Sequence, residues 1–291
     1  MSALQHDLLK GRDPASDQHE LNRRIERYYD RYGDIYDLYQ WYFYDWFQQR
    51  AWWDEALWML RRIRPKPAHV LDLGCGTGNL ALKFMDAGSD VIGVDISRRM
   101  IEILQRKAET QPRGRMDLVV ADTLEFAQSA RRSFDVVCEC SVLHHIFGYQ
   151  ELVRAMARTV RPGGFLFLTR EPFGPQELAP IGAARAAVNS LLERLYHHIL
   201  TRMANARRFS HMVPPPDLSR ISANFYESGI SLARVRAVTA EEGLQEVRLR
   251  RWNERETGLL SYLDNRLFRR FRRERFQKTF YSLILQRPAP P

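Results

Sequence analysis

Three glycines at alternate positions follow a short apolar run near residue 70. The stretch VLDLGCGTGNL, residues 70–80, places Gly74, Gly76 and Gly78 between this run and a helical pattern. Glycines at such a turn let the backbone bend sharply and approach a ligand without Cβ clashes. The free N–H groups of the next helix would face that ligand. Since ligands of open parallel sheets bind beyond the carboxyl ends of the strands, the stretch predicts a nucleotide-type binding site.

Two carboxylates help to distinguish between the nucleotides that could bind there. A dinucleotide fingerprint has the spacing G-x-G-x-x-G, and Asn79 stands where its third glycine would be. Asp95 ends the next apolar run, where a carboxylate can accept hydrogen bonds from both ribose hydroxyls. Asp122 ends the third run and is placed to meet an adenine edge. This set favours a single adenosine with a charged amino-acid tail.

The elements that must position these residues alternate between strands and helices. Apolar runs predict strands over residues 69–74, 90–95, 116–122, 134–140 and 164–170, with helical stretches between them. Such alternation implies crossover units and a parallel sheet covered on both faces. Later in the chain we expect helices over 183–207, 231–242 and 259–271, and strands over 244–252 and 278–286.

Five segments in this order resemble the class I S-adenosylmethionine-dependent methyltransferases. They are VLDLGCGTGNLALKF, VIGVDISRRMIEIL, VVADTLEF, FDVVCECSVLHHI and LVRAMARTVRPGGFLFLTR, within residues 68–170. The resemblance implies an α/β, Rossmann-like fold: a seven-stranded, mostly parallel sheet with helices on both faces. It also implies an N-terminal helical cap over 1–65 and a catalytic domain over 66–291. A helical insertion is expected at about 173–227, between strands five and six.

The resemblance also implies S-adenosylmethionine as the cofactor and assigns residues to it. The acid that matches Asp95 binds the ribose hydroxyls, and the acid that matches Asp72 helps to hold the methionine amino group. The remaining matched positions lie along the methionine, the adenine or the sulfonium end: Gly74, Cys75, Gly76, Gly78, Asn79, Ile96, Ser97, Met100, Asp122, Thr123, Cys140 and Ser141.

Aromatic residues are crowded between residues 28 and 58. Charged residues interrupt this region, whereas a membrane-spanning helix needs about 20 mostly apolar residues. In many small-molecule members of the family an N-terminal helical segment closes over the cofactor. Candidates for this lid are Tyr28, Tyr29, Tyr32 and Tyr36, of which Tyr28 and Tyr36 are assigned to the cofactor site. Trp46, Trp52, Trp53 and Trp58 are expected to pack onto the sheet, and a break in the helix is expected near Gly33 and Asp34.

Two histidines, His144 and His145, follow the fourth strand at the expected mouth of an acceptor site. An imidazole titrates near neutrality, so either could act as a general base. The alternative is that they pack against or orient a loop, as paired histidines here often do in the family. The motif CSVLHH also lacks the proline pair of nucleic-acid amino-methyltransferases. A small-molecule acceptor is therefore favoured, with lipidic and glycosylated compounds among the options.

The net charge of +9 leaves other partners open. Five arginines lie close together in or after the expected helix 259–271, which could be a solvated core helix or could lie on an anionic membrane surface. The same region could recruit RNA or protein as the acceptor, and a non-catalytic cofactor-binding protein is a further alternative. The oligomeric state is left open.

The cysteines and the N-terminus bear on the compartment. Cys75, Cys138 and Cys140 cannot form a disulfide framework, and they are more typical of packed thiols than of metal ligands. Residues 1–20 lack the apolar segment of a signal peptide. We therefore expect a cytoplasmic protein without a metal site, with peripheral membrane contact as an option.

Overall fold

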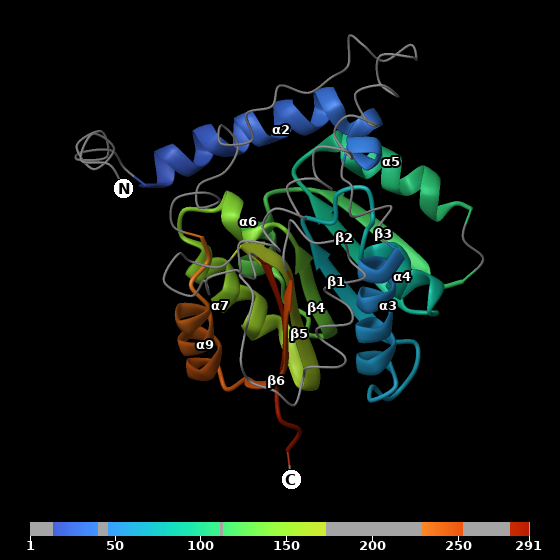
Figure 1. The fold of residues 1–291 in the computed structure, drawn as a ribbon, viewed down its shortest axis with the longest axis vertical. Helices are drawn as coiled ribbons and strands as arrows, with labels where there is room; N and C mark the ends of the chain where they lie inside the picture. The colour runs from blue at the N-terminus through green and yellow to red at the C-terminus, as the bar shows by residue number, and fades with distance from the viewer. Residues whose placement is uncertain (1–13, 40–45, 111–112, 173–228, 253–279, 291) are drawn as a thin grey trace, which may run out of the picture.

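A computed structural model shows the fold (Figure 1) and describes residues 14–39, 46–110, 113–172, 229–252 and 280–290. Its helices are α2 (Pro14–Tyr39), α3 (Trp46–Leu60), α4 (Ala81–Asp86), α5 (Arg98–Ala108), α6 (Thr123–Ser129), α7 (Tyr149–Thr159) and α9 (Leu232–Glu241), with a short 3₁₀ helix, η2 (Leu143–His145). Its strands are β1 (His69–Leu73), β2 (Asp90–Asp95), β3 (Arg115–Val120), β4 (Phe134–Cys140), β5 (Val160–Pro172), β6 (Gln245–Trp252) and β7 (Phe280–Gln286).

One seven-stranded sheet forms the centre of the molecule, with the order β3-β2-β1-β4-β5-β7-β6. Strands β1 to β5 pair in parallel, and β7 runs antiparallel to both β5 and β6. The chain reverses its direction of winding between β1 and β4, which is where open α/β sheets bind ligands. The predicted fold class, a mostly parallel seven-stranded sheet between helices, is confirmed.

Alternating side chains on the strands divide the core between the two faces of the sheet. On one face Leu71 and Val137 pack with residues of α6, α7 and α9. On the other face Val70 and Val136 pack with α3, α4 and α5. Figure 1 shows α7 and α9 on the left of the sheet and α3 and α4 on the right. This period of two is what a sheet buried on both faces requires.

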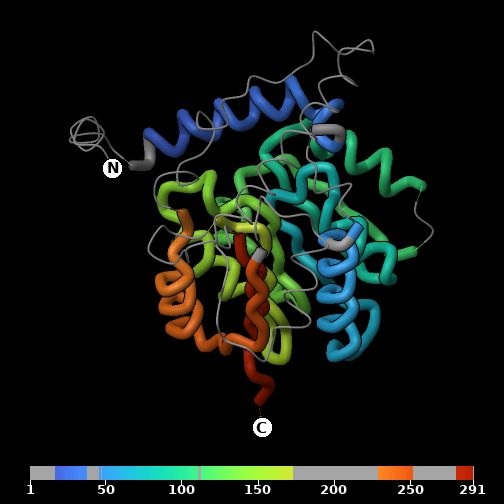
Figure 2. Tube along the Cα trace, viewed as in Figure 1, coloured from blue at the N-terminus to red at the C-terminus, as the bar shows by residue number. Residues whose placement is uncertain are grey.

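Helix α2 has a different position, because it crosses the end of the sheet instead of covering a face (Figure 2). Its contacts are with segments that follow the strands: Asp30 bonds to the start of α5, and Asp37 bonds to the loop after β1. The helix therefore lies over the carboxyl ends of the parallel strands, as the lid expectation requires. Among the described residues no helix is long and apolar enough to cross a membrane.

Two expectations about the N-terminal region are wrong. The helix does not break at Gly33 and Asp34, since α2 continues to Tyr39. A Cβ at Gly33 would lie 2.9 Å from Cγ of Arg99, so the glycine permits close packing of α2 on α5. Among the four tryptophans, Trp52 is fully buried in the core, but Trp46 is 64% exposed and does not pack onto the sheet. The expected helices at 183–207 and 259–271, and the insertion at 173–227, lie outside the described residues.

Candidate functional site

The loop after β1 has the sharply bent backbone that its glycines predicted. Gly74, Gly76 and Gly78 all have positive φ, at 69°, 51° and 99°. A Cβ at Gly74 would lie 2.3 Å from Val142, and one at Gly78 would lie 2.4 Å from Leu104, so both glycines are required by packing. A Cβ at Gly76 would meet nothing within 4 Å. The open side of the loop is therefore at Gly76.

Asp95 at the end of β2 is held beside this loop. Its two carboxylate oxygens accept hydrogen bonds from the backbone N–H groups of Gly76 and Ser97, each at 2.9 Å. Burial raises the pKa of Asp95 to about 6, against the opposing effect of these two N–H groups. Each oxygen keeps a further lone pair, so the carboxylate can still accept hydrogen bonds from a diol.

Asp72, near the end of β1, is a buried carboxylate that lacks its own partner. It is 1% exposed, and within the described residues neither oxygen has a partner with full hydrogen-bond geometry; the Cys138 thiol and the Ala81 N–H group are only weakly interacting neighbours. Burial raises the pKa of Asp72 to about 7, against smaller opposing effects of the Cys138 thiol and the Ala81 N–H group. An isolated buried carboxylate is costly unless a cation compensates it. Asp72 is therefore suited to binding a positively charged group of a ligand.

Apolar residues follow Asp95 in the chain, and helix α6 is capped by the third candidate carboxylate. The partly buried Ile96 packs against Leu21 and Ile25 of α2, while Met100 is 1% exposed inside α5. Asp122 caps α6 by accepting the N–H groups of Leu124 and Glu125 at 2.8 and 2.9 Å. Its other oxygen accepts a 2.6 Å hydrogen bond from Asn22 of α2.

Of the remaining assigned residues on this side, Ser97 caps α5 and donates to Asp30 at 2.6 Å, and Thr123 is buried at the start of α6. The side chain of Cys75 lies in the core. Only its backbone could therefore face a ligand.

Four tyrosines of α2 form a connected aromatic group, with Tyr29 at its centre. The Tyr29 ring lies 5.3 Å from that of Tyr28 and 5.6 Å from that of Tyr36, edge to face in both cases. Tyr28 also contacts Tyr32 at 5.0 Å. The Tyr29 hydroxyl is 3.4 Å from Nε2 of His145, so this residue links the lid to the loop after β4. The sequence assigned Tyr28 and Tyr36 to the cofactor site, and Tyr29 also reaches across it through its hydroxyl group.

The end of β4 carries Cys140 and Ser141. Burial raises the pKa of the Cys140 thiol to about 11, so the thiol stays protonated at neutral pH and is not an activated nucleophile. Asn79 lies 3.5 Å from its sulfur and accepts a 3.0 Å hydrogen bond from Gln49 of α3. Ser141 has a φ of 63°, an uncommon conformation for a residue other than glycine that turns the chain sharply after β4.

His144 lies beside a buried carboxylate that no sequence motif had identified. His144 is buried, and its Nδ1 is 3.0 Å from Oε2 of Glu171 at the end of β5. Glu171 and Glu139 of β4 are both 0% exposed. Acids inside otherwise apolar strands are rare enough to serve as a signal, and this signal was present in both segments.

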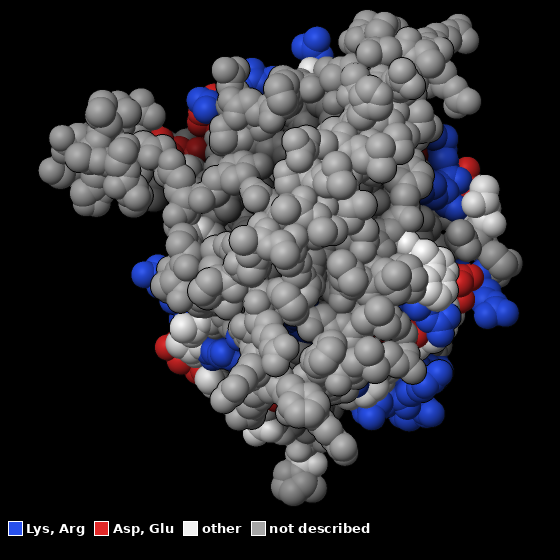
Figure 3. Space-filling model, in the orientation of Figure 1, with Lys and Arg blue, Asp and Glu red and all other residues white. Residues whose placement is uncertain are grey.

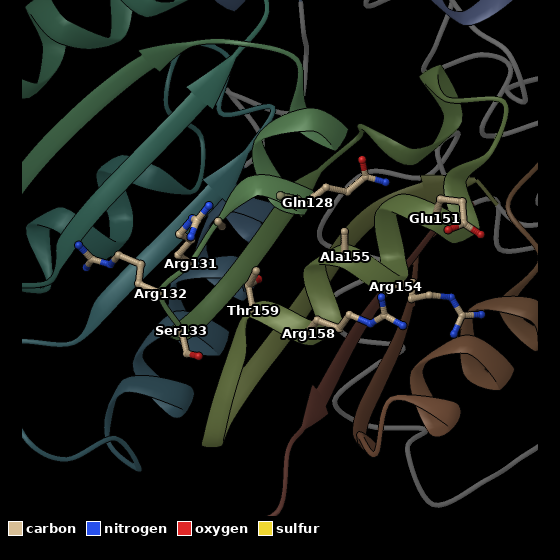
Figure 4. A pocket seen from close by; sticks show the side chains of 11 residues that line it. Gln128, Arg131, Arg132, Ser133, Glu151, Arg154, Ala155, Arg158 and Thr159 are labelled. Carbon is tan, nitrogen blue, oxygen red and sulfur yellow. The ribbon is translucent and has the colours of Figure 1, made fainter. Parts of the chain in front are cut away.

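Two other polar regions lie away from this site. A hollow of about 570 Å³ lies between α6 and α7 (Figure 4), where Arg154 and Arg158 point toward α9 and pair with Glu242. Figure 3 shows lysine and arginine side chains at the lower right of this face. The exposed Arg61, Arg62 and Lys66 follow α3 and lead into the start of β1. These residues precede their strand, so they lie at the opposite end of the sheet from the glycine loop. No group of possible metal ligands occurs among the described residues.

Comparisons with known proteins agree with this geometry. Residues 70–164 match the model of a family described as a methyltransferase domain. The chain is 32% identical over 118 residues to a ubiquinone biosynthesis O-methyltransferase of Leptothrix cholodnii, covering 39% of this chain and 49% of that protein. It is 28% identical over 137 residues to the enzyme of the same name from Xanthomonas axonopodis pv. citri, covering 47% and 57%. The chain thus spans about half the length of the curated relatives it matches.

A solved structure extends the likeness in fold. The magnesium protoporphyrin IX methyltransferase of Synechocystis PCC 6803, with bound S-adenosylmethionine, superposes with a TM-score of 0.54 at 16% identity. The superposition covers 92% of this chain and 97% of that one. The glycine loop, the carboxyl ends of β1 to β4 and the short helix η2 with His144 all fall inside the family match. Residues 70–164 of this chain are thus similar to a methyltransferase domain, and the chain shares its Rossmann-like fold with the solved methyltransferase.

Proposed function

We propose that this protein is an S-adenosylmethionine-dependent methyltransferase that acts on a small molecule at an oxygen atom. The observation that carries the proposal is the pair of buried carboxylates beside the glycine loop. Asp95 has both oxygens fixed by backbone N–H groups, and Asp72 has no hydrogen-bond partner among the described residues. One site therefore offers acceptors for a diol and a negative charge for a cation.

The residues present fit the cofactor at each of its parts. Asp95 would hold the ribose hydroxyls, and Asp72 would compensate the charge of the ammonium group. The open side of Gly76 would leave room for the part of the cofactor between its ribose and its ammonium group. Ile96 and Met100 would flank the base, with Asp122 near its edge. When bound, the cofactor supplies an electrophilic methyl group on a sulfonium, so the protein's task is to orient the acceptor and exclude water.

The lid supports a site that closes around its ligands. Asn22 donates to Asp122, Asp30 accepts from Ser97, and Asp37 accepts from Thr77 at 2.5 Å in the glycine loop. These contacts reach from the loop after β1 to the loop after β3, so α2 covers all three strand ends that carry the carboxylates. An enclosed site favours a small acceptor over a polymer.

The named relatives support oxygen as the acceptor atom, because both are O-methyltransferases. The ubiquinone pathway in their names also favours an apolar, hydroxyl-bearing acceptor, in line with the lipidic option. RNA is the second candidate acceptor because the chain has a net positive charge. The exposed basic residues at 61–66, however, lie at the end of the sheet opposite the glycine loop. Arg269 to Arg275, and any membrane contact they would make, lie outside the described residues.

A transfer assay with methyl-labelled S-adenosylmethionine tests the proposal. Purified protein would be offered a panel of phenols, aliphatic amines, mixed RNA and protein extract. We expect label in the phenol fraction, and no label there when Asp95 is changed to Ala. Label in RNA alone would refute the small-molecule acceptor. Failure of the protein to bind the cofactor would refute the enzymatic proposal as a whole.

A further inference from the structure

The carboxylate of Asp122 uses its two oxygens for different tasks. Oδ1 accepts the backbone N–H groups of Leu124 and Glu125, at 2.8 and 2.9 Å, and so caps α6. Oδ2 accepts a 2.6 Å hydrogen bond from Nδ2 of Asn22 in α2. A carboxylate has about four lone-pair positions, so the contacts within the described part of the chain leave one, on Oδ2. A ligand group that donates to Asp122 must therefore share this oxygen with Asn22.

Two further contacts fix which way round the carboxamide of Asn22 lies. A carboxylate oxygen can only accept, so the group that faces Asp122 is the amide nitrogen. The amide oxygen accepts a 2.7 Å hydrogen bond from Nε2 of Gln18, one helical turn earlier in α2. Gln18 is held in turn by the loop after β4, because its Oε1 accepts the N–H group of Phe147 at 2.8 Å. Asn22 thus belongs to a chain of contacts that joins the loops after β3 and β4.

The same turn of α2 lies on the apolar residue proposed to flank the base. Leu21 and Ile25 form a small buried cluster, and Ile96, which follows β2, packs against it. Asn22 lies between these two residues in the sequence, so a single turn of the lid contacts both Ile96 and the carboxylate of Asp122. These are the apolar and the polar sides of the proposed base position.

We propose that Asn22 sets the specificity for the base, because it holds the Asp122 carboxylate so that the remaining position on Oδ2 accepts the exocyclic amino group of adenine. This rests on the proposed function, which places the adenine edge at Asp122. Two donors that share one oxygen lie about 4–5 Å apart, so the carboxamide of Asn22 also borders that amino group. Asp122 contacts the base in this arrangement, and Asn22 is a positioning residue that acts through it.

The specificity follows from what a 6-oxo base would place at the same point. Hypoxanthine has a carbonyl oxygen where adenine has its amino group, and two acceptors cannot form a hydrogen bond with each other. An acceptor that is buried without a donor costs free energy, so the base is rejected. A water molecule would relieve the mismatch, because it can donate to the carboxylate and to the carbonyl group at once. Asn22 occupies the place on Oδ2 that such a water molecule would need.

A purely structural role for Asn22 predicts a different result. If its hydrogen bond served only to hold α2 in place, its loss would weaken all ligands beneath the lid by the same factor. A specificity role changes the ratio between ligands instead. The lid provides a matched contact away from the base: Asp30 accepts hydrogen bonds from the Ser97 hydroxyl at 2.6 Å and from the Arg99 N–H group at 3.1 Å.

Titration calorimetry with two nucleotides measures this ratio. S-adenosylhomocysteine and S-inosylhomocysteine differ at position 6 of the base and in the proton on N1 that accompanies the change. We expect the wild-type protein to bind the adenine compound about 100-fold more tightly. In Asn22→Ala this preference should fall to about tenfold, because water then reaches Oδ2. Asp30→Ala should weaken both nucleotides equally and keep the wild-type preference. An unchanged preference in Asn22→Ala would overturn the proposal.

Two further variants test the direction of the effect. Gln18→Ala frees the amide oxygen of Asn22, so it should reduce the preference for adenine by a smaller factor than Asn22→Ala does. Gln105→Ala removes an exposed amide of α5 that also bonds to a carboxylate one turn away, that of Glu109, and it should change neither affinity. A loss of preference in Gln105→Ala equal to that in Asn22→Ala would contradict the assignment to Asn22.

A measurement on the wild-type protein removes the dependence on the folding of any variant. Protein labelled with ¹⁵N-asparagine would be examined by ¹H–¹⁵N correlation, with the side-chain amide of Asn22 identified by its loss in Asn22→Ala. We expect this signal to shift when S-adenosylhomocysteine binds, because the amide then borders the amino group of the base. A signal that does not shift in the saturated complex would overturn the proposal.

The outcomes separate this inference from the function on which it rests. If the wild-type protein binds S-adenosylhomocysteine but Asn22→Ala keeps the full preference for adenine, this inference fails and the proposed function stands. If the wild-type protein binds neither nucleotide, the proposed function itself fails.

Discussion

The unpartnered Asp72 carboxylate makes cofactor affinity depend on pH in a way that can be worked out. Its pKa is raised to about 7 and that of Asp95 to about 6, and both must be ionised to accept the ammonium and the ribose. Binding therefore weakens as the pH falls through these values. At pH 6.0 about 9% of ligand-free molecules carry an ionised Asp72, against about 76% at pH 7.5.

The expected effect is a loss of affinity between pH 7.5 and pH 6.0. Asp72 accounts for about an eightfold loss and Asp95 for about a further twofold, so the dissociation constant should rise about fifteenfold. Titration calorimetry with S-adenosylhomocysteine measures this directly. Repeating the titration at pH 6.5 in buffers of different ionisation enthalpy should show net proton release on binding.

A substitution isolates the contribution of Asp72. Asp72→Asn should bind more weakly at pH 7.5, and its remaining pH dependence should be only the roughly twofold change due to Asp95. Asp117→Asn, an exposed change on β3, should keep the wild-type profile. If wild-type affinity were flat between pH 6.0 and 7.5, or if Asp72→Asn kept the full dependence, the assignment of Asp72 to the ammonium would be refuted.

Three further changes test the same account. Asp72→Asn should stabilise the ligand-free protein, because a carboxyl group whose pKa is raised on folding costs stability as the pH rises from about 4 to about 7. We expect the free energy of unfolding, measured with urea, to increase by a few kcal/mol at pH 8 and not to increase at pH 4. Gly76→Ala should cost about 1–2 kcal/mol for its left-handed backbone and weaken S-adenosylhomocysteine binding at least about tenfold, since its Cβ meets no protein atom; unchanged affinity would place the ligand elsewhere. Asp30→Ala removes the hydrogen bonds that join α2 to Ser97 and Arg99, so amide hydrogen exchange in α2 should rise about tenfold with little change in global stability. Unaltered exchange would contradict the role of Asp30 in holding the lid.

Features encoded by local chemistry were predictable from the sequence. Gly74 to Gly78 and Asp95 lie where a strand, a turn and a helix start follow one another within a few residues, so their spacing locates them, whereas Asp72 was assigned through the family resemblance. The five parallel strands were found in the same way, because continuous apolar runs between helices have few other solutions.

Features set by distant parts of the chain could not be found in this way. Gly33 reads as a helix break, yet close packing on Arg99 of α5 keeps the helix continuous. Glu171 follows a bulge, and only the pairing of β5 with β7 shows that it turns inward to His144. Asn22 reaches Asp122 across a separation of one hundred residues. Each of these depends on tertiary contacts that no local pattern contains.

The most direct test of the central claim is a crystal structure of the complex with S-adenosylhomocysteine. The account predicts the ribose hydroxyls on Asp95, the amino group within hydrogen-bond distance of Asp72, and the sulfur beside the loop that carries His144. A nucleotide bound elsewhere, or bound here with Asp72 still lacking a cationic partner, would contradict it.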